Sequence, residues 1–244
     1  MILLGAGVIA GFLNVMAGGG SLLTVPIMVF MGIPGPVANG TNRIGILAQN
    51  ITAVITFFRK GFSDFKLSLS LAAMAIPGSI AGALVGTRLE GIWFNRTLAI
   101  IMFGVMIITA FDVGNKKSQT YETIPRKRLI AGHLLMAAVG FYGGFIQIGV
   151  GFIIMPVLHS VLGIDLVRTN MHKVFIVGCY TITALIVYAS QGQILWFFGF
   201  CLAIGNSIGG WLGTHTSISK GDKTIKIVLN SILVVFIIKL LFFS

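Results

Sequence analysis

The chain has 244 residues, of which 56% are hydrophobic and 9% are charged, and its formal net charge is +11. Soluble proteins contain about 25% charged residues, so this composition argues against a soluble globular domain. The Lys and Arg residues lie mainly between apolar runs. This placement indicates a membrane protein with a basic side and argues against nucleic-acid binding.

Apolar segments follow one another along the whole chain. A helix needs about 20 mostly apolar residues to cross a bilayer, so we expect an all-α integral membrane protein. Its surroundings are the lipid bilayer of a bacterial-type inner membrane, which it crosses several times. The first segment has no positive n-region and no cleavage site, and we interpret it as a membrane segment. The segments lie at about 2–15, 21–33, 43–58, 66–87, 95–112, 128–146, 151–163, 172–189, 193–213 and 225–243.

Glycine-rich breaks interrupt this pattern twice. The first lies at 17–20 and the second at 147–151. The segments beside the first break have only about 12 to 14 residues, which is too short for a bilayer core at about 1.5 Å per residue. The segment after the second break is also short. Each break therefore predicts a pair of helical segments joined by irregular backbone.

The two halves of the chain resemble each other. ITAVITFFRKG (51–61) matches ITALIVYASQG (182–192), and Asn39 falls on Asn170 at the same offset of 131. Further blocks match in the same order, which predicts an internal duplication. The predicted units are a first transmembrane repeat at 1–112, a basic cytoplasmic linker at 113–128 and a second transmembrane repeat at 129–244.

The basic residues distinguish two topologies. If each broken pair crosses the membrane once, Lys and Arg are divided equally between the two sides. If each pair is a re-entrant hairpin, the second half is inverted, and thirteen Lys and Arg residues lie on one side against three on the other. Because positive loops stay in the cytoplasm, we expect an inverted repeat. Each half then consists of a Gly-broken re-entrant helical hairpin and three transmembrane helices.

A family resemblance begins at the first break. The residues that carry it are the glycine triplet 18–20, Ser21, Pro26 and the run 38–42 followed by Arg43. On these residues the chain resembles the sulfite exporter TauE/SafE family over nearly its whole length. The resemblance implies a transporter for sulfite, an organosulfonate or a related small anion. The second half departs from the pattern, since Met171 and His172 stand where Gly40 and Thr41 are expected.

Both glycine breaks are candidate anion sites. A helix that begins after a break presents free N–H groups and the positive end of its dipole. Two breaks in an inverted repeat are expected to meet near the membrane midplane. The alternative is a tight turn in a packed hairpin. The candidates are Gly18, Gly19, Gly20 and Ser21 in the first break and Gln147, Gly149 and Gly151 in the second.

A second group of candidates precedes or opens the next apolar segment of each half. Amide, hydroxyl and cationic donors suit an oxyanion with several acceptor oxygens. The alternatives are helix capping by Asn39 or Thr41, a snorkelling flank for Arg43 and an interfacial polar group for His172. The candidates are Asn39, Thr41, Asn42 and Arg43 in the first half and Asn170, His172 and Lys173 in the second.

Few other residues suggest chemistry. Gln49 and Asn50 lie inside an apolar run and are expected to tie helices together. Carboxylates are almost absent from the apolar segments, which argues against a proton relay. The His residues lack the spacing of metal ligands, so we expect no cofactor, metal or catalysis. The expected function is a secondary carrier or facilitator for a small anion, by alternating access around the breaks. The alternatives are an anion channel and a membrane enzyme.

Overall fold

The computed structural model describes residues 2–89, 91, 93, 94, 96, 97, 100 and 124–242. All regular structure in this part of the chain is helical, without any strand, which confirms the predicted all-α class. The predicted apolar segment at 95–112 lies almost entirely outside the described residues. Residues 113–123 of the predicted linker lie outside them as well.

The helices follow the predicted apolar segments. Gly221 has φ 62° and ψ −162°, so α9 consists of two helices joined at a kink. A π-helical turn, η1, extends α7, and α6 begins at Arg126, inside the segment expected to be a linker. The elements are α1 (Ile2–Met16), α2 (Ser21–Phe30), α3 (Gly35–Arg59), α4 (Phe65–Gly86), α6 (Arg126–Phe145), α7 (Val150–Pro156), η1 (Val157–Val161), α8 (Leu166–Ser190) and α9 (Trp196–Phe242).

Three of the described helices, α4, α6 and α8, are long and apolar enough to cross a membrane. Large apolar side chains cover the outside of the molecule. Leu134, Ile186 and Phe197, for example, are 64%, 62% and 75% exposed. A soluble protein rarely exposes such continuous apolar surface. The described helices therefore have the length and the surface of a multi-pass membrane protein, as the composition predicted.

The two broken pairs differ in length. α1 has 15 residues and α2 has 10, so neither reaches the roughly 20 residues of a full crossing. α6 has 20 residues and is itself long enough to cross. The sequence predicted a short segment only after the second break and an apolar run at 128–146 before it, and α6 (Arg126–Phe145) agrees with that run.

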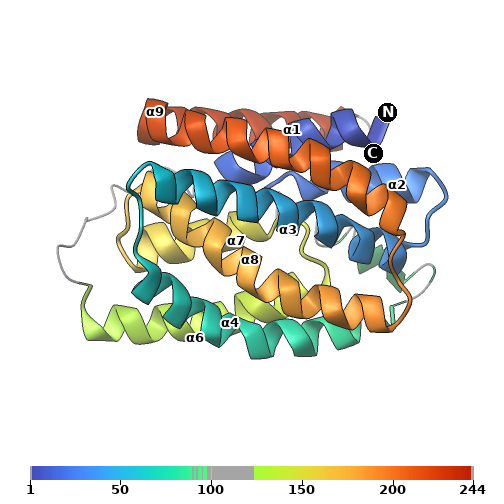
Figure 1. Ribbon diagram of the computed structural model, residues 1–244, viewed down its shortest axis with the longest axis horizontal. Coiled ribbons are helices and arrows are strands. Elements are labelled where there is room, and N and C mark those ends of the chain that lie inside the picture. The colour runs from blue at the N-terminus through green and yellow to red at the C-terminus, as the bar shows by residue number, and fades with distance from the viewer. Residues whose placement is uncertain are drawn as a thin grey trace.

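Helices from the two parts of the chain pair with each other. α1 lies along α9 at one edge of the molecule, α6 lies along α4 at the other, and α3 and α8 lie between the two pairs (Figure 1). Both pairs approach closely through glycine. A Cβ on Gly209 of α9 would collide with the backbone of Val8, and one on Gly140 of α6 would collide with the backbone of Ala75. Membrane helices pack by such close approach of their backbones.

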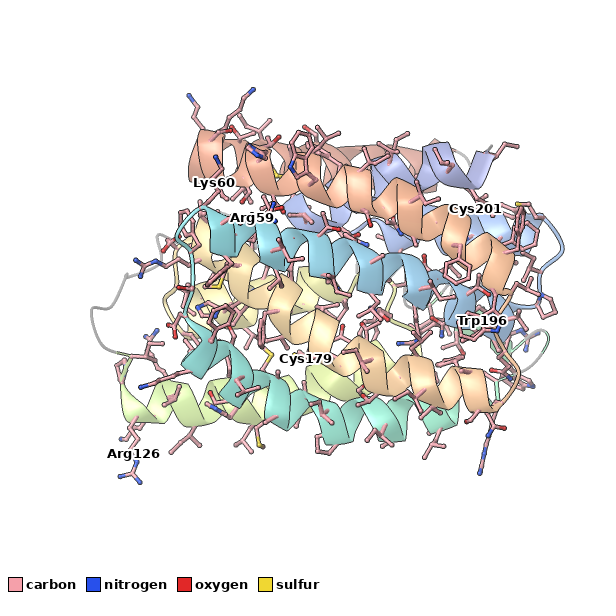
Figure 2. All side chains as sticks on the ribbon, in the orientation of Figure 1. Arg59, Lys60, Arg126, Cys179, Trp196 and Cys201 are labelled. Carbon is pink, nitrogen blue, oxygen red and sulfur yellow. The ribbon has the colours of Figure 1, made fainter. Side chains whose placement is uncertain are left out.

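Basic residues gather at one end of the helices, which we call the basic end. Lys60 and Arg126 lie there, and Trp196 lies at the opposite end (Figure 2). The Arg128 guanidinium donates to the carbonyl of Val161 over 3.3 Å. This bond joins the start of α6 to the end of η1, so the chain enters and leaves the second broken pair at the basic end.

Candidate functional site

The two glycine breaks are in direct contact. Gly18 lies between α1 and α2 and has φ 83°, a conformation that favours glycine. A Cβ on Gly18 would overlap the backbone of Gly151, and a Cβ on Gly151 would overlap the backbone of Gly18. Only glycine at both positions allows this approach. The N-terminal and C-terminal parts of the chain therefore meet at these two residues.

The other glycines of the breaks form the turns around this contact. Gly149 is left-handed, with φ 68°, and is the N-cap of α7. Gly20 packs against the carbonyl of Ala10 and donates its N–H to Oδ1 of Asn14 over 2.9 Å. Gly19 faces the ring of Phe152. For these three glycines the alternative interpretation, a tight turn in a packed hairpin, describes the geometry.

A cavity lies beside the Gly18–Gly151 contact. Its volume is about 20 Å³, and one water molecule needs about 10 to 15 Å³ by this measure, so the cavity has room for about one water in this conformation. In the part of the chain that the structure describes, six polar side chains and no carboxylate line it. Among the described residues, no three His, Cys, Asp or Glu side chains come together as metal ligands. The lining residues are Asn14, Gly18, Ser21, Ile46, Gln49, Asn50, Gln147, Val150, Gly151, Lys173, Val174 and Val177.

Lys173 is the one ionisable side chain among the described residues of the cavity wall. Its side chain is 2% exposed. Its Nζ donates to the carbonyl of Val15 and to Oδ1 of Asn170, each over 2.7 Å. Val15 lies in the last turn of α1, where the free carbonyls carry the negative end of the helix dipole. The hydrogen-bond partners of Lys173 are thus neutral carbonyl and amide oxygens.

A chain of amides reaches the cavity from α1. Nδ2 of Asn14 donates to Oε1 of Gln49 over 3.2 Å, and Nε2 of Gln49 donates to Oδ1 of Asn50 over 3.4 Å. Nδ2 of Asn50 is buried and has no hydrogen-bond partner among the described residues. Buried donors without a partner are rare in folded proteins. This donor belongs to a residue of the cavity wall, so it is available to an acceptor bound there.

Arg43 lies outside the cavity wall. Its side chain is completely buried, so the snorkelling interpretation is wrong. Its Nη1 donates to the carbonyl of Gly143 over 3.0 Å and to Oε1 of Gln147 over 2.7 Å, and its Nη2 donates to the carbonyl of Gly144 over 2.5 Å. The guanidinium also lies 4.5 Å from the ring centroid of Tyr188. Arg43 therefore binds the carbonyls in the last turn of α6.

Gln147 connects Arg43 to the cavity. Its φ of 59° is the only positive value among the described residues other than glycine, and such values are uncommon for a residue with a side chain. Its Oε1 accepts from Arg43, and its Nε2 donates to Oγ1 of Thr181 over 3.1 Å. These two bonds fix a strained residue in the cavity wall. Arg43 thus contacts the site through Gln147 and not directly.

The remaining polar candidates join helices. α3 begins at Gly35 and α8 at Leu166, so these residues lie inside helices, and the capping interpretation of Asn39 and Thr41 is wrong. His172 is 2% exposed, so the interfacial interpretation is wrong as well. The bonds are those of Asn39 with Tyr188 and Phe145, Thr41 with Leu195, Asn42 with Thr24, Asn170 with Ser217, and His172 with Ser68.

The cavity contains residues that the sequence did not single out as site residues. Asn14 was missed, and Gln49 and Asn50 were expected only to tie helices together. Gln49 does join α3 to α1 through Asn14, but all three residues also line the cavity. The available signal was Asn14 itself, the only amide in the apolar helix α1, four residues before the glycine triplet.

The chain matches a known protein family over nearly its whole length. The family profile described as "Sulfite exporter TauE/SafE" matches residues 3–240. The chain is 29% identical over 241 residues to the probable membrane transporter protein YfcA of Escherichia coli K12, an alignment that covers 97% of this chain and 87% of the relative. It is 27% identical over 238 residues to the probable membrane transporter protein ORF9 of Sinorhizobium sp., covering 97% and 90%. No solved structure matches the chain. This chain belongs to the sulfite exporter TauE/SafE family of membrane transporters.

Proposed function

We propose that this protein is a secondary carrier for a small sulfur oxyanion, either sulfite or an organosulfonate, which binds in the cavity at the Gly18–Gly151 contact. One observation carries the proposal: among the described residues, the cavity wall holds a buried basic side chain, Lys173, and no carboxylate. Family membership and the relatives described as probable membrane transporters support transport. The choice of a sulfur oxyanion follows from the description of the family.

The cavity wall has the donors that a small oxyanion requires. Lys173 supplies a charge, Asn50 supplies an N–H without another partner, and Ser21 supplies a hydroxyl at the first residue of α2. Charged donors form the stronger hydrogen bonds to an anion, and amide and hydroxyl donors add direction. A carboxylate in the wall would repel the anion. The composition of the wall therefore favours an anion over a cation or a neutral solute.

Binding requires the two breaks to move apart. The present cavity has room for about one water, which is less than a sulfur atom with three or four substituents occupies. Gly18 and Gly151 belong to different parts of the chain and meet only through their backbones. Movement of one part against the other enlarges the cavity without breaking a helix. Alternating access then consists of opening this contact toward one side of the membrane at a time.

The proposed architecture is an inverted repeat of residues 1–112 and 129–244 around a cytoplasmic linker at 113–128. The crossed pairing of α1 with α9 and of α6 with α4 supports it. Each break with its flanking helices is a re-entrant hairpin in this arrangement, and α1 with α2 forms the shorter one. By the positive-inside rule, the basic end faces the cytoplasm. The bond between Arg128 and Val161 at that end is consistent with a second hairpin that opens there.

The membrane potential is a sufficient driving force for export. With the cell interior negative, each unit of negative charge gains about 2.3 kcal/mol per 100 mV on leaving. An exporter for an anion therefore needs no proton-carrying carboxylate.

The test is the flux of radiolabelled sulfite in proteoliposomes with an imposed potential. We expect a flux that saturates, shows counterflow, responds to the potential and is inhibited more strongly by taurine than by acetate. A flux that rises linearly with sulfite concentration without counterflow indicates a channel. Flux no greater than in empty liposomes, from protein shown to be folded, contradicts the assignment of a sulfur anion.

A further inference from the structure

Two buried cations occupy related positions in the two parts of the chain. Arg43 in α3 binds the carbonyls of Gly143 and Gly144 in the last turn of α6. Lys173 in α8, 130 residues later, binds the carbonyl of Val15 in the last turn of α1. Each cation thus comes from one part of the chain and binds the C-terminal end of the first helix of the other part. The last carbonyls of a helix lack partners and carry partial negative charge, so both contacts are favourable.

The two cations differ in how completely they are bound. Arg43 uses both terminal nitrogens in three hydrogen bonds and stacks on Tyr188, and it does not line the cavity. Lys173 makes two short hydrogen bonds, and its remaining neighbour is the thioether sulfur of Met155 at 3.9 Å. A thioether is a weak acceptor, whereas an ammonium has three N–H donors. Lys173 therefore retains a donor for a third partner in the cavity.

The buried ammonium of Lys173 is expected to destabilise the fold while it serves the function. No carboxylate pairs with it among the described residues, and an ammonium taken out of water without an opposite charge is a source of instability. An apolar side chain of similar length fits the same space without this cost. Ionisable residues inside membrane proteins are typically there for function. Arg43 is the reverse case, because its removal leaves Gly143, Gly144 and Gln147 without their donor.

We infer that Lys173 is the group that contacts the negative charge of the substrate, and that Arg43 is a positioning residue that holds Gln147 and the end of α6 in the cavity wall. This inference rests on the proposed function and divides roles that the sequence had assigned to both residues equally. An anion in the cavity accepts the free N–H of Lys173. Arg43 does not touch the anion.

The experiment compares three variants, Lys173→Met, Arg43→Met and Arg43→Lys, with Lys127→Met as a control that removes an exposed charge. The unfolding temperature is measured in detergent with and without sulfite, and sulfite flux is measured in proteoliposomes. Lys173→Met is expected to unfold at the wild-type temperature or above it. It is also expected to lose the sulfite-induced rise in unfolding temperature and to reduce flux at least tenfold.

Arg43→Met is expected to unfold at least about 5 °C below wild type, because the carbonyls of Gly143 and Gly144 and Oε1 of Gln147 lose their donor. Its flux is expected to fall because the maximal rate and the amount of folded protein both decrease. Its KM for sulfite is expected to stay within about threefold of the wild-type value. Arg43→Lys is expected to recover part of both losses, because Lys173 itself shows that an ammonium can bind the end of a helix. Lys127→Met leaves both measurements unchanged.

The outcomes separate this inference from the proposed function. If Lys173→Met keeps the sulfite-induced stabilisation and the wild-type KM, transport stands and the role of Lys173 is wrong. If Arg43→Met unfolds at the wild-type temperature but raises the KM, Arg43 contacts the anion and its positioning role is wrong. If wild-type protein shows neither stabilisation by sulfite nor flux, the proposed function fails. The order of unfolding temperatures without sulfite then still tests the structural role of Arg43.

Discussion

The turn that follows α3 and the turn that follows α8 have the same backbone conformation but are packed differently. α3 is followed by Gly61 and α8 by Gly192, which are 131 residues apart and have φ 83° and 69°. The residue after each glycine donates its N–H to the carbonyl five residues earlier over 3.0 Å, from Phe62 in one turn and from Gln193 in the other. The difference between the ends therefore arises from what each turn faces.

The turn after α8 is sealed against the start of α3. The carbonyl of Gln193 lies against Gly40, so closely that a Cβ there would overlap it. The N–H of Leu195 donates to Oγ1 of Thr41 over 2.9 Å, and Nε2 of Gln193 donates to the carbonyl of Thr87 over 2.8 Å. We call this region, residues 40–41 with 193–195, the sealed end.

The turn after α3 leaves a hollow instead. It faces the start of α8, where Met171 occupies the position that corresponds to Gly40. The hollow has a volume of about 330 Å³ and is lined by Gly61, Phe62, Ser63, Asp64, Arg168 and Met171. It belongs to the basic end of the molecule. A glycine lets one turn close onto its helix, whereas a methionine fills the corresponding place at the other end. The two similar turns thus differ in packing where their facing helices differ in side-chain size.

The largest expected effect is a difference in thiol labelling between the two ends. Ser63 is exposed, and Ile194, its counterpart 131 residues later, is 8% exposed. In a background that lacks Cys179 and Cys201, the Ser63→Cys variant in detergent is expected to react with a maleimide at least tenfold faster than the Ile194→Cys variant. The cysteine-free protein is the control. Equal rates would mean that the sealed end opens as readily as the basic end, and the comparison would fail.

The second prediction concerns Gly40. Alanine normally stabilises a helix by about 1 kcal/mol relative to glycine, but Gly40→Ala is expected to destabilise this protein by about 1 to 3 kcal/mol, the usual range for overpacking. The added Cβ overlaps the carbonyl of Gln193 and the ring of Tyr188. The unfolding temperature measures the effect. Gly5→Ala is the matched control, because a Cβ at Gly5 in α1 meets nothing within 4 Å. A higher unfolding temperature for both variants would contradict the tight seal.

The glycine breaks were predictable because their signal is local. Gly18 and Gly151 interrupt apolar runs, and a broken helix in a membrane protein must be packed against other protein. The start of α3 was misplaced, although Pro34 and Pro36 mark it, since the polar run 39–43 reads as a loop. Those residues are buried inside a helix because polar groups from other helices surround them, and no local pattern reports such partners.

Which of Arg43 and Lys173 lines the cavity was not predictable from the sequence for the same reason. Both are basic residues near the start of a long helix. Lys173 forms a hydrogen bond with Val15, 158 residues away in the sequence. Arg43 forms hydrogen bonds with Gly143 and Gln147, which are 100 and 104 residues away. Contacts at such separations depend on how the crossed helix pairs pack. The internal duplication identified both residues as candidates. Only the packing of the helices shows that Lys173 lines the cavity and Arg43 does not.

The smallest expected effect is at Thr41, and it tests the seal one hydrogen bond at a time. Thr41→Val keeps the shape of the side chain and removes the oxygen that accepts from the N–H of Leu195. A partly buried N–H without an acceptor costs about 1 kcal/mol, so the unfolding temperature is expected to fall by about 2 to 4 °C. Labelling of Ile194→Cys in the same chain is expected to accelerate, because the turn after α8 loses one of its bonds to α3. Thr41→Ser keeps the hydroxyl and is the control. If Thr41→Val changes neither quantity, the close approach at Gly40 closes this end by itself, and the hydrogen bond is a consequence of the seal and not a cause.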